Sequence, residues 1–254
     1  MKKLLCVDGN SLLNRAFYGV KPLTTRDGKN TNATFGFIKM LNNHLQSVKP
    51  DYAAIAFDLK KPTFRHEKCD FYKANRKGMP TELAEQLEDS KNAAQLLGFH
   101  MLTKEGFEAD DILGTLSEYG RQGIQVYLLT GDRDSYQLVG ENVKVLYLST
   151  NQTTEIDEKA VYEKYGVKPR SLIEVKALMG DSSDNIPGVK GIGEKTALDL
   201  IKRFETVENL YNFDKKYHRF EGVLETGEKL SSFLQKLRSP QFVPCVDTGH
   251  ALLT

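Results

Sequence analysis

The chain has 254 residues, of which 40% are hydrophobic and 27% charged, and its formal net charge is +1. These are ordinary values for a soluble globular protein with one large domain, or with a large and a small one. No apolar run approaches the roughly eighteen residues of a membrane-spanning helix, which excludes a membrane-embedded chain. The apolar start ends at Asp8, too early for a signal peptide, so we expect a cytoplasmic protein.

The overall charge conceals a basic segment. Residues 60–80 contain seven Lys or Arg against two acids. Nucleic-acid-binding domains are usually basic, so a net charge of +1 does not by itself favour that function. A metal site built from many carboxylates lowers the charge of the protein without its cations, so the total does not decide the question.

Short apolar runs alternate with helical patterns over the first 150 residues. We expect buried strands at Lys3–Val7, Tyr52–Phe57, His100–Leu102, Gln125–Leu129 and Val143–Tyr147. Helices are predicted between them, the first of them capped by Asn10 or Ser11 and running to about Tyr18. This alternation predicts an α/β fold with a mainly parallel central sheet flanked by helices.

Residues 59–81 interrupt the alternation. The segment is basic, contains aromatic residues, is bounded by Pro62 and Pro80, and has only weak periodicity. An excursion of this length in a compact domain is usually a functional or mobile loop.

Acidic residues follow three of the predicted strands. Asp8 and Asp58 follow the first two, and Asp132 and Asp134 follow the strand that ends at Leu129. The carboxyl ends of parallel strands form the edge at which open α/β sheets bind ligands, so these acids can converge there. One such Asp is more often a turn or cap residue, but three acidic strand ends favour a site for hard divalent cations.

Three more acids, Glu108, Asp110 and Asp111, lie just before an apolar helical pattern. Crowded carboxylates repel one another, so at least one pKa must rise unless a cation sits among them. The alternative is helix capping, because Asp and Glu favour the first turn of a helix. Taken together with the strand-end acids, this group favours a metal site.

The pattern becomes helical after about residue 155. Helices are predicted over Asp157–Tyr165 and Leu172–Met179, and a third ends near Phe204. Asp181 and Asp184 follow the second helix and add two more acids.

A glycine-rich turn precedes the third helix. It contains Gly188, Gly191 and Gly193, and it is flanked by Lys190 and Lys195. Such a turn allows backbone amides to approach phosphate oxygens. Two helices joined in this way suit a non-specific grip on a nucleic-acid backbone.

Six motifs, spread from Met1 to about Phe204, together resemble the 5′-nuclease family. They are Val7–Ser11 with Arg15, Phe57–Asp58, Arg65–Glu67 with Tyr72–Arg76, Glu108–Asp111, Thr130–Asp134 and Gly180–Gly188. The family includes phage 5′-exonucleases, flap endonucleases and the amino-terminal nuclease domain of bacterial DNA polymerase I, which the chain resembles most.

The resemblance implies a nuclease that uses two Mg²⁺ or Mn²⁺ ions. The positions that match those around the first cation are Asp8, Asp58, Glu108, Asp110 and Asp132. The positions that match those placing the second cation, partly through waters, are Asp111, Asp134, Asp181 and Asp184.

The same resemblance implies DNA-binding roles. Residues 59–81 match a helical arch that admits a single-stranded 5′ end, and Lys73 and Arg76 in it match basic residues near the scissile phosphate. Residues 185–204 match a helix–hairpin–helix-type element that holds the downstream duplex, often with a monovalent cation such as K⁺ at residues 188–193. We also expect Arg15 and Tyr72 to contact DNA.

We therefore expect an α/β nuclease core over residues 1–155, which includes the arch, and a helical DNA-binding region over residues 156–254. The expected substrate is DNA with a 5′ flap, nick or 5′ end, cut by a monomer linked functionally to a DNA polymerase in replication and repair. No polymerase portion follows, so a stand-alone protein and an excised domain both remain open. The tail beyond about Glu228 does not follow the family pattern.

Two other functions are compatible with parts of this pattern. One is a catalytically silent protein that binds branched DNA, against which the complete set of nine acids argues. The other is a related metal-dependent ribonuclease, against which the chain length and the 185–204 element argue.

Overall fold

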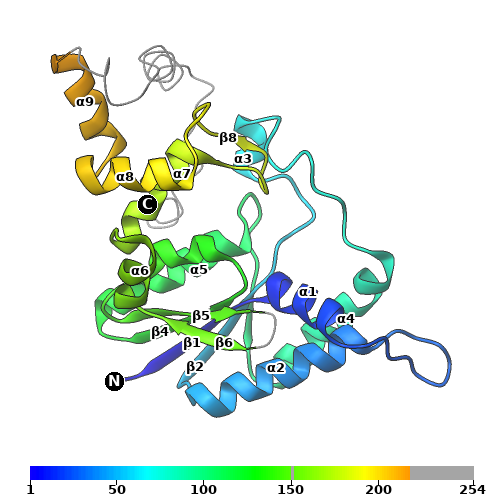
Figure 1. Ribbon diagram of the computed structural model, residues 1–254. Helices are drawn as coiled ribbons and strands as arrows, with labels where there is room; N and C mark the ends of the chain where they lie inside the picture. Colours follow the sequence, from blue (N-terminus) through cyan, green and yellow to red (C-terminus); the bar gives the residue numbers. More distant parts are fainter. Residues whose placement is uncertain (150–151, 218–254) are drawn as a thin grey trace. The chain divides into compact units, whose positions relative to one another are not determined.

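The computed structural model describes residues 1–149 and 152–217. Its elements, in chain order (Figure 1), are β1 (Lys3–Asp8), α1 (Gly9–Gly19), α2 (Asn32–Val48), β2 (Tyr52–Ala56), α3 (Phe64–Lys68), α4 (Thr81–Leu96), β3 (His100–Leu102), α5 (Ala109–Ser117), η1 (Glu118–Gln122), β4 (Gln125–Thr130), η2 (Arg133–Leu138), β5 (Val143–Leu148), β6 (Thr153–Ile156), α6 (Glu158–Tyr165), η3 (Pro169–Ser171), α7 (Leu172–Met179), β7 (Gly180–Asp181), β8 (Ile186–Pro187), α8 (Glu194–Phe204) and α9 (Val207–Tyr217). No helix in these ranges is both long and apolar enough to cross a membrane.

The described chain forms two compact units. Unit 1 contains residues 1–61 and 77–158, and unit 2 contains residues 62–76 together with the described residues from 159 onward. Part of the expected arch, with the short helix α3, thus groups with the later helices. The expected tail beyond Glu228 lies outside the described residues.

Unit 1 is built on one sheet, whose six described strands have the order β3-β2-β1-β4-β5-β6. The first five strands along the chain run parallel, which confirms the expected α/β fold with a mainly parallel sheet. The antiparallel edge strand β6 was not expected from the sequence. Its residues are largely exposed and lack an apolar alternation, so only pairing with β5 identifies it as a strand.

Helices cover both faces of this sheet. The segments that connect β1 to β2 and β2 to β3 place α1, α2 and α4 on one face, and α5 packs on the other (Figure 1). The direction of strand progression reverses between β1 and β4, as in doubly wound folds. Ligands bind at such a reversal because the loops leave the two strands in opposite directions.

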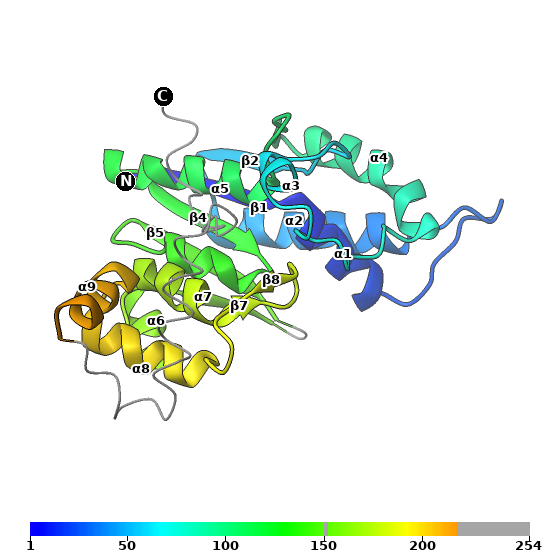
Figure 2. The ribbon, with the colours of Figure 1, turned by 90° about the horizontal axis from the view of Figure 1, so that it is seen from above.

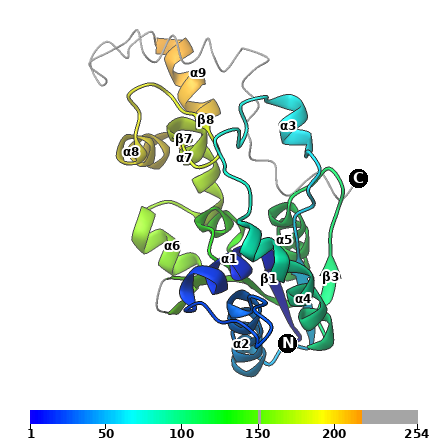
Figure 3. The same cartoon turned by 90° about the vertical axis from the view of Figure 1, so that its right-hand side faces the viewer.

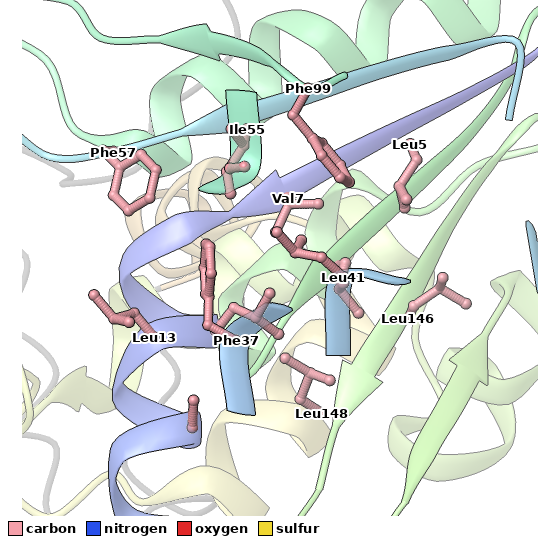
Figure 4. Close-up of a cluster of buried hydrophobic side chains, with 14 of the residues drawn as sticks. Leu5, Val7, Leu13, Phe37, Leu41, Ile55, Phe57, Phe99, Leu146 and Leu148 are labelled. Atoms are coloured by element: carbon pink, nitrogen blue, oxygen red, sulfur yellow. The ribbon is translucent and has the colours of Figure 1, made fainter. Parts of the chain in front are cut away.

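The main core lies between the sheet and the layer of α1, α2 and α4. Leu5 and Val7 point into it from β1, because alternate residues of a strand face the same side. Phe37 and Leu41 of α2 fill the space opposite them (Figure 4). All four side chains are fully buried, so the carboxyl end of β1 is held on a rigid base.

The link between α1 and α2, residues 20–31, extends away from these helices and is closed by a β-bridge from Thr24 to Asn30 (Figure 2). The following helix α2 begins at Asn32 without a side-chain cap from its own N-cap residue, Thr31. Gln86 of α4 supplies the missing acceptor. Its Oε1 accepts from the N–H groups of Ala33 (2.8 Å) and Thr34 (3.2 Å).

Unit 2 has a smaller apolar core of its own, formed mainly by α7 and α8. The short strands β7 and β8 pair antiparallel beside α7 (Figure 3). The backbone of Gly180, in β7, lies very close to that of Gly188, the residue after β8. A Cβ at Gly188 would lie 2.1 Å from the Met179 carbonyl oxygen, so only glycine fits there.

Gln86→Leu is expected to lower the free energy of unfolding by about 2–4 kcal/mol, because one buried and one partly buried N–H group of α2 lose their acceptor. Urea unfolding measures this change. Gln95→Leu on the exposed face of the same helix is the matched control and should change stability by less than about 0.5 kcal/mol. Equal effects of the two substitutions would contradict the role of Gln86.

Candidate metal and nucleic-acid site

The acids of unit 1 that follow the strands gather at one edge of the sheet. Asp8 is the last residue of β1, and Asp58 and Asp132 each lie two residues beyond β2 and β4. Strand β1 lies between these two strands and runs parallel to both. Three carboxyl groups far apart in sequence are therefore brought to the carboxyl edge, where the strand order reverses.

Asp8 is buried and receives a hydrogen bond on each oxygen. Its Oδ1 accepts from the Ser11 backbone N–H (2.9 Å), and its Oδ2 accepts from the Thr130 hydroxyl (2.9 Å). Asp8 is thus the N-cap of α1, and the prediction that Asn10 or Ser11 caps this helix was wrong. The helix follows the strand without a loop, so the last strand residue supplies the cap.

Asp58 ties the end of β2 to the start of α5. Its Oδ1 accepts from the Ala109 N–H (2.7 Å), and its Oδ2 accepts from the Asn10 side-chain amide (3.1 Å). A carboxylate at the N-terminus of a helix is favoured by the helix dipole. Through this contact the acidic first turn of α5 lies next to the strand-end acids.

The three acids at the start of α5 differ in their surroundings. Glu108 and Asp111 are buried, whereas Asp110 is half-buried. Asp111 Oδ2 accepts from the Glu108 backbone N–H (2.9 Å), as a residue that stabilises the first helical turn does. Helix capping and a clustering of acids therefore occur together here.

Asp132 and Asp134 lie in the turn after β4. The Asp132 N–H donates to the Thr130 hydroxyl oxygen (3.1 Å), and Asp132 Oδ1 accepts from the Asp134 N–H (2.8 Å). Asp132 is thereby the N-cap of η2. Its carboxylate is half-buried and fixed relative to the end of β4.

Electrostatics at this edge disfavour a charged Asp8. Burial raises the pKa of Asp8 to about 6, and the negative charges of Asp58 and Asp132 add to the rise. Hydrogen bonds from Ser11 and Thr130 oppose it without cancelling it. The carboxylates therefore repel one another, and a cation bound among them would relieve this repulsion.

The donor set fits Mg²⁺ better than a metal that needs a closed protein cage. In the described residues, no three Asp, Glu, His or Cys side chains stand close enough together to enclose one ion. Mg²⁺ usually keeps several waters and uses one or two carboxylates. Carboxylates that range from buried (Asp8) to exposed (Asp58), spaced around a common edge, match that requirement.

In unit 2, Asp181 is held by charge and hydrogen bonds. Its Oδ2 accepts from Lys176 Nζ (2.6 Å), and its Oδ1 accepts from the Ser183 hydroxyl (2.6 Å) and N–H (2.8 Å). Partial burial disfavours the charge, but these donors outweigh it and lower the pKa of Asp181 to about 2. Asp181 is therefore ionised at any ordinary pH.

Asp184, also in unit 2, pairs with the arch segment. Its Oδ1 forms an ion pair with Arg76, and its Oδ2 accepts from the hydroxyl of Tyr72 (3.4 Å). The Lys73 N–H donates to the Asp184 carbonyl oxygen (2.8 Å), and the Asn185 amide donates to the Phe71 carbonyl (2.8 Å). Residues 71–76 and the loop 182–185 thus form one hydrogen-bonded substructure.

The predicted arch residues Tyr72, Lys73 and Arg76 all lie in this substructure, but their environments differ. Lys73 has a left-handed backbone (φ 53°), and its Nζ lies 5.0 Å from the centre of the Tyr72 ring. Arg76 is exposed, whereas Tyr72 is buried at 4% exposure. Tyr72 therefore has a packing role in this substructure, and an exposed contact with DNA requires it to move.

The predicted glycine turn separates its apolar and basic residues. Val189 and Ile192 are buried in the core of unit 2, while Lys190 and Lys195 are exposed. Gly191 has φ 87°, a conformation that a side chain disfavours. Gly193 is the N-cap residue of α8.

Sequence reasoning did not single out four polar residues that contact the acids. They are Asn10 and Ser11, which were considered only as helix caps, together with Thr130 and Lys176. Arg15, which was singled out, is half-buried, and its Nη1 donates to the Leu148 carbonyl (3.3 Å). The sequence signal for Asn10, Ser11 and Thr130 is their place in the motifs Val7–Ser11 and Thr130–Asp134, whereas Lys176 has only its position five residues before Asp181.

Comparison with protein families gives two matches in order along the chain. A domain described as "5'-3' exonuclease, N-terminal resolvase-like domain" matches residues 3–166. A second, "5'-3' exonuclease, C-terminal SAM fold", matches residues 167–243. The second match extends beyond Phe204, where the sequence motifs ended.

Curated relatives include DNA polymerase I of Caldicellulosiruptor bescii, which is 40% identical over 240 residues, covering 92% of this chain and 28% of the relative. DNA polymerase I of Synechocystis sp. is 44% identical over 237 residues, covering 88% of this chain and 24% of the relative. The chain thus spans about a quarter of the length of these relatives.

A solved structure of T5 D15 flap endonuclease, in a complex with DNA and metal ions, has the same fold. Its TM-score is 0.73 at 25% identity, and the alignment covers 94% of this chain and 88% of that one. The resemblance predicted from the motifs is confirmed. With both of its domains matched in order and its fold shared with T5 flap endonuclease, the chain belongs to the 5′-3′ exonuclease family of nucleases.

Proposed function

We propose that this chain is a structure-specific 5′-nuclease that hydrolyses phosphodiester bonds of DNA at 5′ ends and 5′ flaps with the help of divalent cations. The observation that carries the proposal is the placement of Asp8, Asp58 and Asp132 at the reversal point of the sheet, where burial, together with the charges of the other two, raises the pKa of Asp8. Family membership supports the same reaction.

The acids of unit 1 are the proposed ligands of the first cation, directly or through water. They are Asp8, Asp58, Glu108, Asp110 and Asp132, whereas Asp111 and Asp134 are proposed to help place the second cation. Two divalent cations, Mg²⁺ or Mn²⁺, supply neutralisation of the charge that develops on a phosphodiester during hydrolysis. The protein itself contributes carboxylates that hydrogen bonds have already oriented, as in the bonds from Ser11 and Thr130 to Asp8.

Asp181 and Asp184 of unit 2 are also proposed to contribute to the second cation. Each of them forms an ion pair in the structure, with Lys176 and Arg76 respectively. A cation at either acid competes with its basic partner. Once a cation displaces Arg76 from Asp184, the Arg76 side chain becomes available to bind a phosphate. The observed ion pair is therefore compatible with the catalytic role proposed for Lys73 and Arg76.

The glycine turn of unit 2 is the proposed grip on duplex DNA. Its backbone amides and the exposed Lys190 and Lys195 suit phosphate contacts, which carry no sequence information. A K⁺ ion on carbonyl groups of residues 188–193 is part of the proposal. The domain division also remains proposed, with the nuclease core in residues 1–155 and the DNA-binding region after it.

The relatives support the wider setting. Since they are DNA polymerases I, we infer a role in DNA replication and repair, a cytoplasmic location and a functional link to polymerase activity. The monomeric state belongs to the proposal as well.

Incubation with a 5′-flap duplex, a nicked duplex and a blunt duplex in Mg²⁺ tests this function. Preferred cutting of the flap that stops in EDTA is the expected result. A matched flap made of RNA identifies a ribonuclease by faster cutting, and binding of branched DNA without cutting identifies a silent binder. Either of these two results would overturn the proposal.

Asp132→Asn should lower the cleavage rate by more than about a hundredfold, because it removes a charged ligand from the reaction centre. DNA affinity should stay the same or increase, since one negative charge near the phosphates is lost. Single-turnover cleavage and fluorescence anisotropy measure the two quantities. Glu141→Gln on an exposed turn is the control, and a normal rate for Asp132→Asn would contradict the metal assignment.

Asp8→Asn should stabilise the protein at pH 7.5 in EDTA by up to about 3 kcal/mol. The folded-state pKa of Asp8 is raised to about 6, so its charge destabilises the fold above that pH. The gain should shrink as the pH falls through 6 and vanish below about 4, where Asp8 is protonated in both states. Thermal unfolding across pH measures the effect, and a gain independent of pH contradicts it.

The double substitution Lys190→Ala/Lys195→Ala should flatten the slope of log affinity against log salt by up to roughly 2 units. The loss of affinity should be equal on unrelated duplex sequences, because phosphate contacts carry no sequence information. Lys39→Ala/Lys49→Ala, two exposed lysines near α2, is the matched control. An unchanged slope for the first variant would mean that other residues hold the duplex.

A further inference from the structure

Thr130 is the last residue of β4, and its side chain is fully buried between the acids of unit 1. We propose that the hydroxyl groups of Thr130 and Ser11 are positioning groups that set Asp8 and the Asp132 turn in the geometry a divalent cation requires. This inference rests on the proposed function, because it assigns a role in cation binding to residues outside the predicted ligand set.

The direction of each hydrogen bond of Thr130 follows from its partners. The Asp8 carboxylate can only accept when ionised, so the Thr130 hydroxyl donates its one proton to Asp8 Oδ2 at 2.9 Å. The same oxygen then accepts from the Asp132 backbone N–H at 3.1 Å. One hydroxyl therefore joins the ends of β1 and β4 across the point where the strand order reverses.

These bonds restrict the Asp8 carboxylate without using up its acceptor capacity. The Ser11 N–H takes Oδ1 and the Thr130 hydroxyl takes Oδ2, so rotation about the Cβ–Cγ bond breaks one bond or both. A carboxylate has about four lone-pair sites, so each oxygen can still bind a cation. The arrangement holds a ligand in place while it stays available.

Ser11 fixes the other side of the same turn. Its hydroxyl oxygen accepts from the Gly131 N–H at 2.8 Å, one residue before Asp132. A Cβ at Gly131 would lie 2.9 Å from that oxygen, closer than real contacts allow. A side chain at this position would displace the Ser11 hydroxyl, and residues 130–132 are held at two successive amides.

A purely structural role predicts lower stability when these hydroxyls are removed, but unchanged cation affinity. The positioning role predicts weaker cation binding in addition. Removal of a group that orients a metal ligand typically lowers metal affinity or activity by about 10- to 100-fold. The two roles are therefore separated by measuring cation binding directly, in the absence of DNA.

The test uses two variants. Thr130→Val replaces the hydroxyl by a methyl group of similar size, and Thr130→Ser keeps the hydroxyl but loses the methyl group. Mn²⁺ binding to the protein alone is measured by electron paramagnetic resonance of the free ion. Thr130→Val should weaken Mn²⁺ binding by about 10- to 100-fold, whereas Thr130→Ser should bind Mn²⁺ as the wild type does. The Mn²⁺ concentration for half-maximal flap cleavage should rise in parallel.

Ser117→Ala is the matched control, since it removes a buried hydroxyl that donates only to the Gly114 carbonyl oxygen (2.6 Å). It should lower stability in urea and leave Mn²⁺ binding unchanged. If Thr130→Val does not fold, Ser11→Ala against Ser11→Thr decides the question by the same measurement.

Wild-type Mn²⁺ affinity in Thr130→Val, or in Ser11→Ala if that pair decides, would overturn the positioning role and leave the proposed nuclease function standing. Absence of both Mn²⁺ binding and cleavage in the wild type would overturn both. Weakened binding in Thr130→Val that Thr130→Ser does not recover would show that shape, not the hydroxyl, matters, and would also overturn the inference.

Discussion

Burial of the Asp8 carboxyl group close to other carboxylates, at the reversal point of the sheet, is the constraint on which the site in unit 1 depends. Burial raises the pKa of Asp8 to about 6, and the negative charges of Asp58 and Asp132 add to the rise. A fold selected for stability alone has no reason to place acids there. The electrostatic cost of placing acids together is offset in part by hydrogen-bond donors. The Ser11 N–H and the Thr130 hydroxyl donate to Asp8, and the Ala109 N–H donates to Asp58.

The same residues serve the fold and the site at once. Asp8 caps α1, and Asp132 caps η2, so the groups that begin these helices are also the proposed cation ligands. Capping uses one oxygen of a carboxylate and leaves lone pairs on both. The two interpretations of the acidic clusters, helix caps and metal ligands, are therefore compatible in this protein.

Unit 2 manages its acids in another way. Asp181 pairs with Lys176, and Asp184 pairs with Arg76. Against partial burial, the donors Lys176 and Ser183 lower the pKa of Asp181, whereas burial raises that of Asp8. Acids that are already paired are stable without a metal ion, and a cation must compete for them. The ion pair of Arg76 also joins the arch segment to the loop of Asp184, so a movement of one of these segments affects the position of the other.

The sequence by itself determined the α/β class, the positions of the parallel strands and the acids at their ends. Continuous apolar runs and helical periodicity are local signals, and six motifs were enough to indicate the family. The tertiary structure alone decided the edge strand β6, the cap supplied by Gln86 and the bond from Thr130 to Asp8. These depend on the contact of residues far apart in the chain, 122 positions for Thr130 and Asp8, and no local pattern encodes which polar groups will meet there.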